Sequence, residues 1–463
     1  MPAMVDRAPA TVSTRASGVL RRLHRGDLGR RAFGLGLTVI VVVAFGLRLL
    51  LLGSIASADP TGGDPYYYHA QANLVVDGHG FTDPFRLRET LAENPPRAVY
   101  EPVAIHPPLF TLWLAIPSAV GLRSYLAHKV MSCLAGALAV GAIGLFASSV
   151  AGRRAGLIAA VIAAVYPPLW SIDGQLWPEG LFTALVAASC WLAVRARERS
   201  DWRWAAGAGL AVGLATSTRG EAIALAPLLL VPMVGWRPGP WRRRCAEVAV
   251  AGLACLAVLA PWAIRNLRTF EHPVWISTNS DEVFVYANNP YAYGTEDGGR
   301  FLGFWFYPWQ DQLRADFGEA PGDASEKARY WREMGVQYAK EHKGRWPVVA
   351  AARLGRAWNL YAPFQNAAFD KIDGKSETVS RIGVWTWWAV LIGSVPGVVV
   401  LRRRRVTLIP FAALALTVSA TAIYAYGANR FRTPLEVAAI VLTAVAVDAW
   451  WSRRAVSLAA GES

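Results

Sequence analysis

The residues best suited to chemistry follow the first long apolar stretch of the chain. In Gly62–Gly80 one acidic residue, Asp64, stands where an apolar span would leave a membrane. Tyr66, Tyr67 and His69 come next and are candidates for lining a cavity or holding an acceptor. The carboxylate could take a proton from an acceptor hydroxyl as general base, bind a divalent cation, or cap the helix beginning beside it. These residues alone leave all three roles open.

Two other candidates stand at predicted helix starts. His106 precedes two prolines and a short apolar segment, so it lies beside free N-terminal amides that favour an anion. It could contact a phosphate or be an ordinary interfacial histidine. Glu179 follows Trp177 and Pro178 at the start of an apolar span. It could interact with the helix dipole, or it could line a cavity and hold a catalytic partner.

Charged residues between apolar spans form a third group. Arg219 and Glu221 lie in one short turn, and they could contact a phosphate or form a mutual structural pair. Arg430 and Arg432 join the last two apolar spans, where they could bind a lipid phosphate or contact ordinary anionic lipid. Arginine suits both phosphate roles because its guanidinium can make bidentate contacts. Arg48, near the end of the first span, is a lesser candidate whose side chain could simply snorkel.

Composition places these residues in a membrane protein. The chain has 463 residues, of which 54% are apolar and 17% are charged, and its mean hydropathy is +0.28. Long apolar blocks of this kind predict an all-α polytopic membrane protein. The net charge of +14 comes mostly from short arginine clusters between those blocks, which is a membrane orientation signal rather than a nucleic-acid surface.

About ten spans are predicted, because each needs about 20 apolar residues. An additional apolar segment, residues 106–121, is short and bounded by prolines, so it is predicted to be a helix lying at the membrane interface. The spans are expected at about 33–53, 124–150, 155–172, 178–195, 204–217, 221–236, 246–264, 382–401, 406–425 and 434–451.

Arginine-rich turns follow the even-numbered spans, and the N-terminal tail is also basic. This pattern predicts that both termini are cytoplasmic and that the candidate residues gather on the opposite, extracytoplasmic face. The long polar segment 265–380 should form a small, partly helical cap there. The expected organisation is a disordered tail 1–32, a membrane core 33–264 with the first outer loop 54–123, the cap 265–380, C-terminal helices 381–451 and a tail 452–463.

The order of these motifs resembles the GT-C glycosyltransferases, in particular the family 39-like group of protein O-mannosyltransferases and lipid A aminoarabinose transferases. The resemblance rests on Asp64 after the first span, on His106–Leu109 in the place of a basic-Pro-Pro motif, on Pro178 with Glu179, and on Arg430–Pro434. Two positions depart from the protein mannosyltransferases: a proline follows Asp64 where they usually carry an Asp-Glu pair, and His106 stands where a lysine is often found.

The resemblance implies a GT-C-like fold and a transferase that uses a polyprenyl-phosphate sugar. Asp64 would be the general base, with inversion at the anomeric carbon, and Glu179 would be a second acidic position lining the cavity. The donor phosphate would be bound by His106, Arg219, Arg430 and Arg432. No nucleotide-binding loop is evident, no cofactor is expected, and a divalent cation is possible but not indicated.

The sequence therefore predicts a glycosyltransferase of the bacterial plasma membrane that acts on an envelope lipid, polysaccharide or protein, with no nucleic acid as partner. A lipid-linked oligosaccharide flippase or transporter is one alternative, and it would place charged residues at mid-span. A polysaccharide polymerase or ligase with a diphosphate-linked donor is another. A structural subunit of an envelope complex is the third, and it leaves Arg219, Arg430 and Arg432 unexplained.

Overall fold

The chain is helical throughout its described residues. The computed structural model describes residues 28–55, 59–60, 62–305, 320–371 and 373–461. Within these ranges no strand forms, and one isolated antiparallel bridge joins Thr82 to Pro102. The prediction of an all-α polytopic membrane protein is confirmed. The expected disorder of the tail 1–32 falls on residues that, apart from 28–32, lie outside the described part.

Six described helices are long and apolar enough to cross a membrane. A bent pair, α7 (Arg153–Val165) and α8 (Pro167–Asp173), makes a seventh if it counts as one span. The pair bends by 55° where two prolines open α8, because proline cannot donate the next helical hydrogen bond. The six are α2 (Arg30–Ile55), α6 (Tyr125–Ala151), α9 (Glu179–Arg199), α11 (Trp241–Thr269), α17 (Glu377–Arg403), and η5 (Asn429–Arg432) continuing into α19 (Thr433–Gly461).

The three remaining expected spans are shorter helices. These are α10 (Trp202–Thr218), the η1–η2 segment Gly220–Gly235, and α18 (Ile409–Tyr424). The segment after α10 runs as a 3-10 turn, η1 (Gly220–Ala224), and then a π-helix, η2 (Ala226–Gly235). Prolines at the start and inside η2 remove backbone donors, which accounts for the irregular winding.

Helix α6 packs against α2, α7 and α9. In other pairs of membrane helices, small residues let the two backbones approach closely. Two glycines show how close the backbones come. A Cβ atom at Gly209 of α10 would overlap the carbonyl of Ala251 on α11, and one at Gly397 of α17 would overlap the carbonyl of Leu442 on α19. Helix pairs in membranes commonly use small residues in this way.

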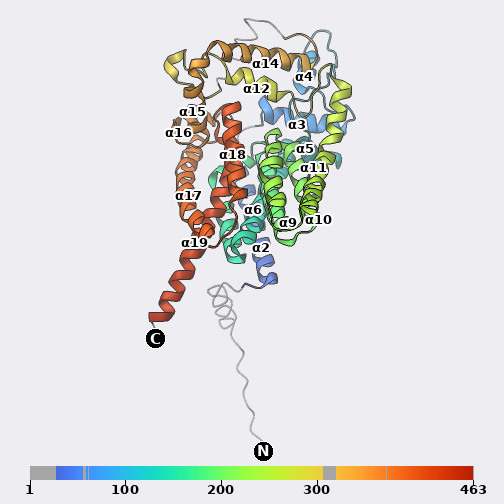
Figure 1. The fold of residues 1–463 in the computed structure, drawn as a ribbon. Coiled ribbons are helices and arrows are strands. Elements are labelled where there is room, and N and C mark those ends of the chain that lie inside the picture. Colours follow the sequence, from blue (N-terminus) through green and yellow to red (C-terminus); the bar gives the residue numbers. More distant parts are fainter. Residues whose placement is uncertain (1–27, 56–58, 61, 306–319, 372, 462–463) are drawn as a thin grey trace, which may run out of the picture.

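Three helices fill the first connection, between α2 and α6. They are α3 (Gly63–Val76), α4 (Pro84–Leu91) and α5 (Leu109–Ala119). The short apolar segment predicted to lie at the interface is α5, which packs on α3. Both lie at one end of the bundle, and the opposite end holds the beginning of α2 and the end of α19 (Figure 1).

The segment between α11 and α17 forms the expected small cap. Its helices α12 and α14 lie over the same end of the bundle as α3 and α4 (Figure 1). The segment is partly helical, and α14 and α15 are its two longest helices. The cap elements are α12 (Asn279–Ala287), η3 (Asp297–Gly299), α14 (Ala324–Glu341), η4 (Lys343–Arg345), α15 (Trp346–Ala357) and α16 (Pro363–Phe369).

Of two buried arginines in α15, Arg353 joins the cap to a membrane helix, and Arg356 makes its hydrogen bonds within the cap. Arg353 donates from Nη1 to the carbonyl of Ile423 in α18 at 2.7 Å, and it also bonds the end of α12. Arg356 donates from Nε to the carbonyl of Leu302 at 2.7 Å. The Arg353 bond ties the end of α18, from which the loop to η5 begins, to the cap.

Candidate active site

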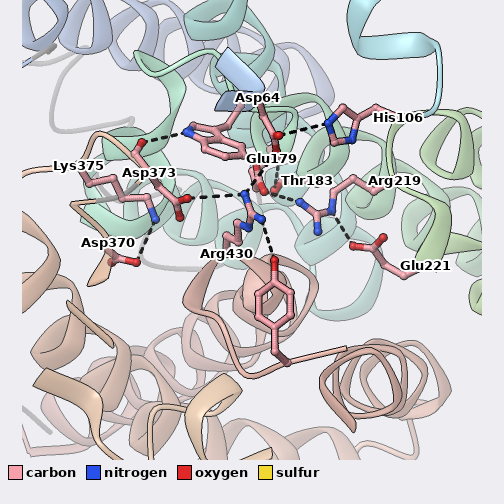
Figure 2. Close-up of polar contacts among 12 residues, drawn as sticks. Asp64, His106, Glu179, Thr183, Arg219, Glu221, Asp370, Asp373, Lys375 and Arg430 are labelled. Atoms are coloured by element: carbon pink, nitrogen blue, oxygen red, sulfur yellow. Dashed lines mark hydrogen bonds and ion pairs between the residues drawn. The ribbon is translucent and has the colours of Figure 1, made fainter. Parts of the chain in front are cut away.

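Asp64 lies in the first turn of α3 and does not cap it. The cap position is Gly62, which makes no side-chain bond, and Gly63 has φ +67°, a left-handed conformation that suits glycine. This turn directs the Asp64 carboxylate toward His106 and Arg430 (Figure 2). The capping role considered for Asp64 is therefore wrong, because its carboxylate contacts side chains from two other segments.

The two contacts of Asp64 are cationic or basic groups. Its Oδ1 lies 3.4 Å from Nε2 of His106, and its Oδ2 lies 3.7 Å from Nη1 of Arg430. Burial alone would raise the pKa of Asp64, but His106, then Arg430 and Arg219, outweigh burial and lower this pKa to about 2. Asp64 is therefore a carboxylate at neutral pH, and a third of its side chain remains exposed.

His106 is held in place by two tyrosines of α3. Its ring stacks on Tyr68 with centroids 4.9 Å apart and meets Tyr67 edge-on at 5.2 Å. The two prolines that follow His106 lead directly into α5, so the imidazole is fixed between α3 and α5. Tyr68 was not among the predicted candidates, although it is four residues after Asp64 and therefore on the same helix face.

Arg430 lies at the centre of the cluster (Figure 2). Its Nη1 is 3.6 Å from Asp373 in the cap, and its Nη2 donates to the Tyr426 hydroxyl at 3.0 Å. Its guanidinium also lies over the ring of Trp177, 4.6 Å from the centroid, and the Trp177 indole donates to the Asp373 carbonyl at 3.0 Å. The sequence did not point to Asp373 or Trp177, because both contacts depend on how the cap folds back.

Arg219 forms the structural pair that the sequence left open, and it has a second partner. Its Nε donates to Glu221 at 2.6 Å, and its Nη1 pairs with Glu179. Glu179 is the first residue of α9 and is fully buried. The guanidinium lies over the ring of Phe431, 5.1 Å from its centroid, which places Arg219 beside the η5 segment.

Arg432 is directed away from Asp64. Its Nε donates to Glu436 at 2.9 Å, and its guanidinium lies over Trp387, 4.5 Å from the ring centroid. It faces a pocket between α8 and α17, which we call the α8–α17 pocket. The residues around this pocket include Ser171, Asn359, Asp370, Lys375, Ser380, Asn429, Arg430, Arg432, Thr433 and Glu436.

The other candidates of the first loop have contacts of their own. The Tyr66 hydroxyl is 3.5 Å from the Pro84 carbonyl, and the Tyr67 hydroxyl accepts a hydrogen bond from Gln71 at 2.6 Å. His69 faces His128, with their Nδ1 atoms 3.0 Å apart. Of these three, Tyr67 touches the cluster through His106, whereas Tyr66 and His69 make the contacts given above away from the cluster.

Arg48 does not snorkel as the sequence suggested. Its Nε bonds Asp173 at 2.6 Å, and both side chains are fully buried. The Asp173 carboxylate fits against Gly136 and Gly180, where any larger residue would overlap it. A buried ion pair of this kind joins α2 to the end of α8.

Within the described part of the chain, no three His, Cys, Asp or Glu side chains are grouped so as to hold a metal ion. At the centre of the cluster, the Arg430 guanidinium lies between Asp64 and Asp373. The expectation that no cofactor is used stays a prediction.

Comparisons with known proteins address the fold. Residues 105–264 match the family model described as dolichyl-phosphate-mannose-protein mannosyltransferase. This range contains four candidates, His106, Glu179, Arg219 and Glu221. A comparison with curated protein sequences gave no significant match.

Solved structures of the archaeal oligosaccharyltransferase AglB from Archaeoglobus fulgidus superpose on most of the chain. One, in complex with an inhibitory peptide and a dolichol-phosphate, has a TM-score of 0.54 and 15% identity over 93% of this chain and 51% of that chain. Another, tethered to an acceptor peptide, has a TM-score of 0.55 and 17% identity over 92% and 50%. The chain thus spans about half the length of these proteins.

ArnT from Cupriavidus metallidurans, bound to undecaprenyl phosphate, aligns with 17% identity over 91% of this chain and 79% of that chain, at a TM-score of 0.37. The AglB superpositions and the mannosyltransferase match agree with the order of motifs in the chain. The chain therefore has the membrane fold of the GT-C glycosyltransferases.

Proposed function

We propose that the protein is a membrane glycosyltransferase that moves a sugar from a polyprenyl-phosphate donor to a hydroxyl of an envelope lipid, polysaccharide or protein. One observation carries the proposal: Asp64 is an ionised, partly exposed carboxylate placed among His106, Arg219 and Arg430. A base beside several phosphate-binding cations is what this reaction needs. The likeness to AglB, whose structure contains a dolichol-phosphate, supports the donor class.

In the proposed reaction Asp64 accepts the proton of the acceptor hydroxyl while the oxygen attacks the anomeric carbon. The bond from this carbon to the phosphate oxygen breaks, and its electron pair leaves with the polyprenyl phosphate. The configuration at carbon inverts because attack and departure occur on opposite faces. The charge on the leaving phosphate is stabilised by His106, Arg219, Arg430 and Arg432.

In this scheme Arg430 changes the basicity of Asp64 when the donor binds. Without substrate its positive charge helps to hold the pKa of Asp64 low. When the donor phosphate binds the Arg430 guanidinium, Arg430 stabilises the Asp64 carboxylate less, and the pKa of Asp64 rises. Donor binding thereby makes Asp64 a stronger base at the moment when the acceptor must be deprotonated.

We further propose that the site faces the extracytoplasmic side of a bacterial plasma membrane, with both termini cytoplasmic. The arginine clusters after α17 and in the last turns of α19 support this orientation. The beginning of α2 and the end of α19 lie at the end of the bundle opposite to the cap (Figure 1). A labelling experiment with a cysteine-reactive, membrane-impermeant reagent on a cap cysteine variant tests this directly.

The reaction is tested in membranes that express the protein, with a panel of radiolabelled polyprenyl-phosphate sugars and total envelope acceptors. The wild type should transfer label, and Asp64→Asn at matched expression should not. Asp77→Asn, at the other end of α3 and paired with Arg123, is the control for an acid lost from the same helix.

Transfer that survives Asp64→Asn would overturn the role of Asp64 and make Glu179 the next residue to test. Transfer only from diphosphate-linked donors would replace the proposal with a polymerase or ligase. Folded protein that uses no donor in the panel, yet moves lipid-linked sugar across vesicles, would replace it with a flippase.

A further inference from the structure

The α8–α17 pocket has a set of polar atoms without partners. Among the described residues, five buried polar atoms at this pocket make no hydrogen bond. They are Arg432 Nη1, Asn359 Nδ2, Ser380 Oγ, Thr433 Oγ1 and Asn429 Oδ1. Buried polar groups in folded proteins are nearly always paired, so such a concentration at one pocket indicates a ligand.

The chemistry of these atoms selects the ligand class. Arg432 and Asn359 supply N–H donors only, and Ser380 and Thr433 supply hydroxyls that can donate, whereas the amide oxygen of Asn429 only accepts. A ligand that satisfies this set must consist mainly of hydrogen-bond acceptors. Phosphate oxygens accept and do not donate, whereas sugar hydroxyls do both, so the pocket fits a phosphate better than a sugar.

The charges around the pocket agree with an anion. Arg432 is 3% exposed and keeps one nitrogen free after bonding Glu436. Lys375, 3.6 Å from Asp370, is nearly buried at the same pocket. Arg430 lines the pocket too, and its contact with Asp64 joins the pocket to the reaction centre. The charged residues that line the pocket are thus three cations and two acids, Asp370 and Glu436.

We propose that the α8–α17 pocket binds the phosphate of the polyprenyl carrier, with Arg432, Lys375, Asn359, Ser380 and Thr433 as its ligands. This inference rests on the proposed function and assigns residues that the sequence did not suggest, apart from Arg432. It also separates the two arginines of η5: Arg432 anchors the phosphate inside the pocket, and Arg430 lies between that phosphate and Asp64.

The position of the phosphate sets the direction of the reacting bond. With the phosphate in the pocket, the sugar lies on the Asp64 side of Arg430, so that attack and departure are in line. Pro168 and Val384 provide apolar surface at the pocket, beside the phosphate ligands. Gly383 of α17 lies against Pro168, and a Cβ there would approach the proline ring to 3.3 Å.

Binding of tritiated undecaprenyl phosphate to the full-length protein in phosphatidylcholine nanodiscs tests the inference. Ser380→Asp places a negative charge in the pocket and should weaken binding at least about tenfold. The new carboxylate faces Arg432 and Lys375, so the variant has partners and should fold. The matched control is Ser280→Asp, the same change at an exposed position of the cap helix α12, which should bind as the wild type does.

Thr433→Val is a second variant that does not depend on added charge. The hydroxyl has no partner among the described residues, so its removal should leave the melting temperature unchanged. Carrier binding should nevertheless fall about fivefold, because one phosphate hydrogen bond is lost. If Thr433 had only a structural role, Thr433→Val would lower the melting temperature and leave carrier binding unchanged. Wild-type binding by both pocket variants would overturn the inference.

Competition identifies the source of the phosphate. Phosphatidylglycerol or inorganic phosphate at the concentration of the carrier should not displace it. If either does, the pocket is a general phosphate site and the assignment to the carrier fails. Asp64→Asn should bind carrier at least as tightly as the wild type, because the change releases Arg430 from Asp64. Carrier binding that depends on Ser380 without any sugar transfer would refute the proposed reaction and leave the carrier site standing.

Discussion

Asp64 and Arg430 come from opposite ends of the chain, and 3.7 Å separates the carboxylate Oδ2 from the guanidinium Nη1. The same nitrogen lies 3.6 Å from Asp373 of the cap. One cation is thus shared by the first connection, the cap and the last membrane helix. The geometry of Arg430 should matter as much as its charge.

Arg430→Lys keeps the charge but loses the fork that reaches Asp64, Asp373 and the Tyr426 hydroxyl together. We expect the variant to fold and to lose about 100-fold in kcat for sugar transfer. Steady-state kinetics in membranes measure this loss. Arg381→Lys, an exposed arginine of α17, should keep full activity, and similar kinetics of the two variants would contradict a central role for the fork.

Glu179 and Glu221 should contribute unequally to stability, although both pair with Arg219. Glu179→Gln leaves a buried guanidinium without its buried partner, and we expect it to lower the free energy of unfolding by about 3 kcal/mol. Glu221 is partly exposed, so Glu221→Gln should cost within about 1 kcal/mol. Melting temperatures in detergent compare the two, and equal losses would show that burial does not set the strength of these pairs.

The low pKa of Asp64 makes a prediction about pH. Its pKa in the folded protein, about 2, lies below the ordinary value of 3.8, so the ionised form stabilises the fold. This contribution is fully present above 3.8 and is lost as the pH falls toward the folded-state pKa. The difference in melting temperature between wild type and Asp64→Asn should therefore shrink as the pH falls below about pH 4. A difference that stays the same between about pH 5 and pH 3 would contradict the low pKa.

Gly63 should be needed for the placement of Asp64. Gly63→Ala puts a Cβ at φ +67°, which costs about 1 kcal/mol or shifts the first turn of α3. We expect a clear loss of transfer activity with little change in melting temperature. Gly62→Ala is the matched control, because Gly62 has extended backbone and open space around it. Equal activity of the two variants would show that the turn tolerates a side chain.

The sequence predicted an all-α polytopic membrane protein correctly because this class depends on the length of apolar segments. It predicted Asp64, His106, Arg219 and Arg430 as candidates for a similar reason: charged groups at the ends of spans are costly unless they are used. The structure brings these four together. What the sequence could not supply was the bend between α7 and α8 and the π-helical winding of η2, which depend on local proline geometry.

Side-chain direction explains why some predicted candidates lie away from the Asp64 cluster. His69 is five residues after Asp64, which places it on another face of α3, whereas Tyr68 at four residues shares the face of Asp64. Arg432 is two residues after Arg430 in a 3-10 helix, where residues three apart are aligned, so the two side chains diverge. These rules could have been applied to the sequence. The contact of Asp373 with Arg430 could not have been found, because it depends on a long cap segment folding back.

The buried Arg353 of α15 has a consequence for access. To lift the cap, Arg353 would have to leave the carbonyl of Ile423 in α18, at about 1.5–3 kcal/mol. Because Arg353 bonds the end of α18, the same movement would also displace the loop that carries Arg430. Any movement of the cap is therefore mechanically coupled to the guanidinium that faces Asp64, so opening the site would also disassemble it.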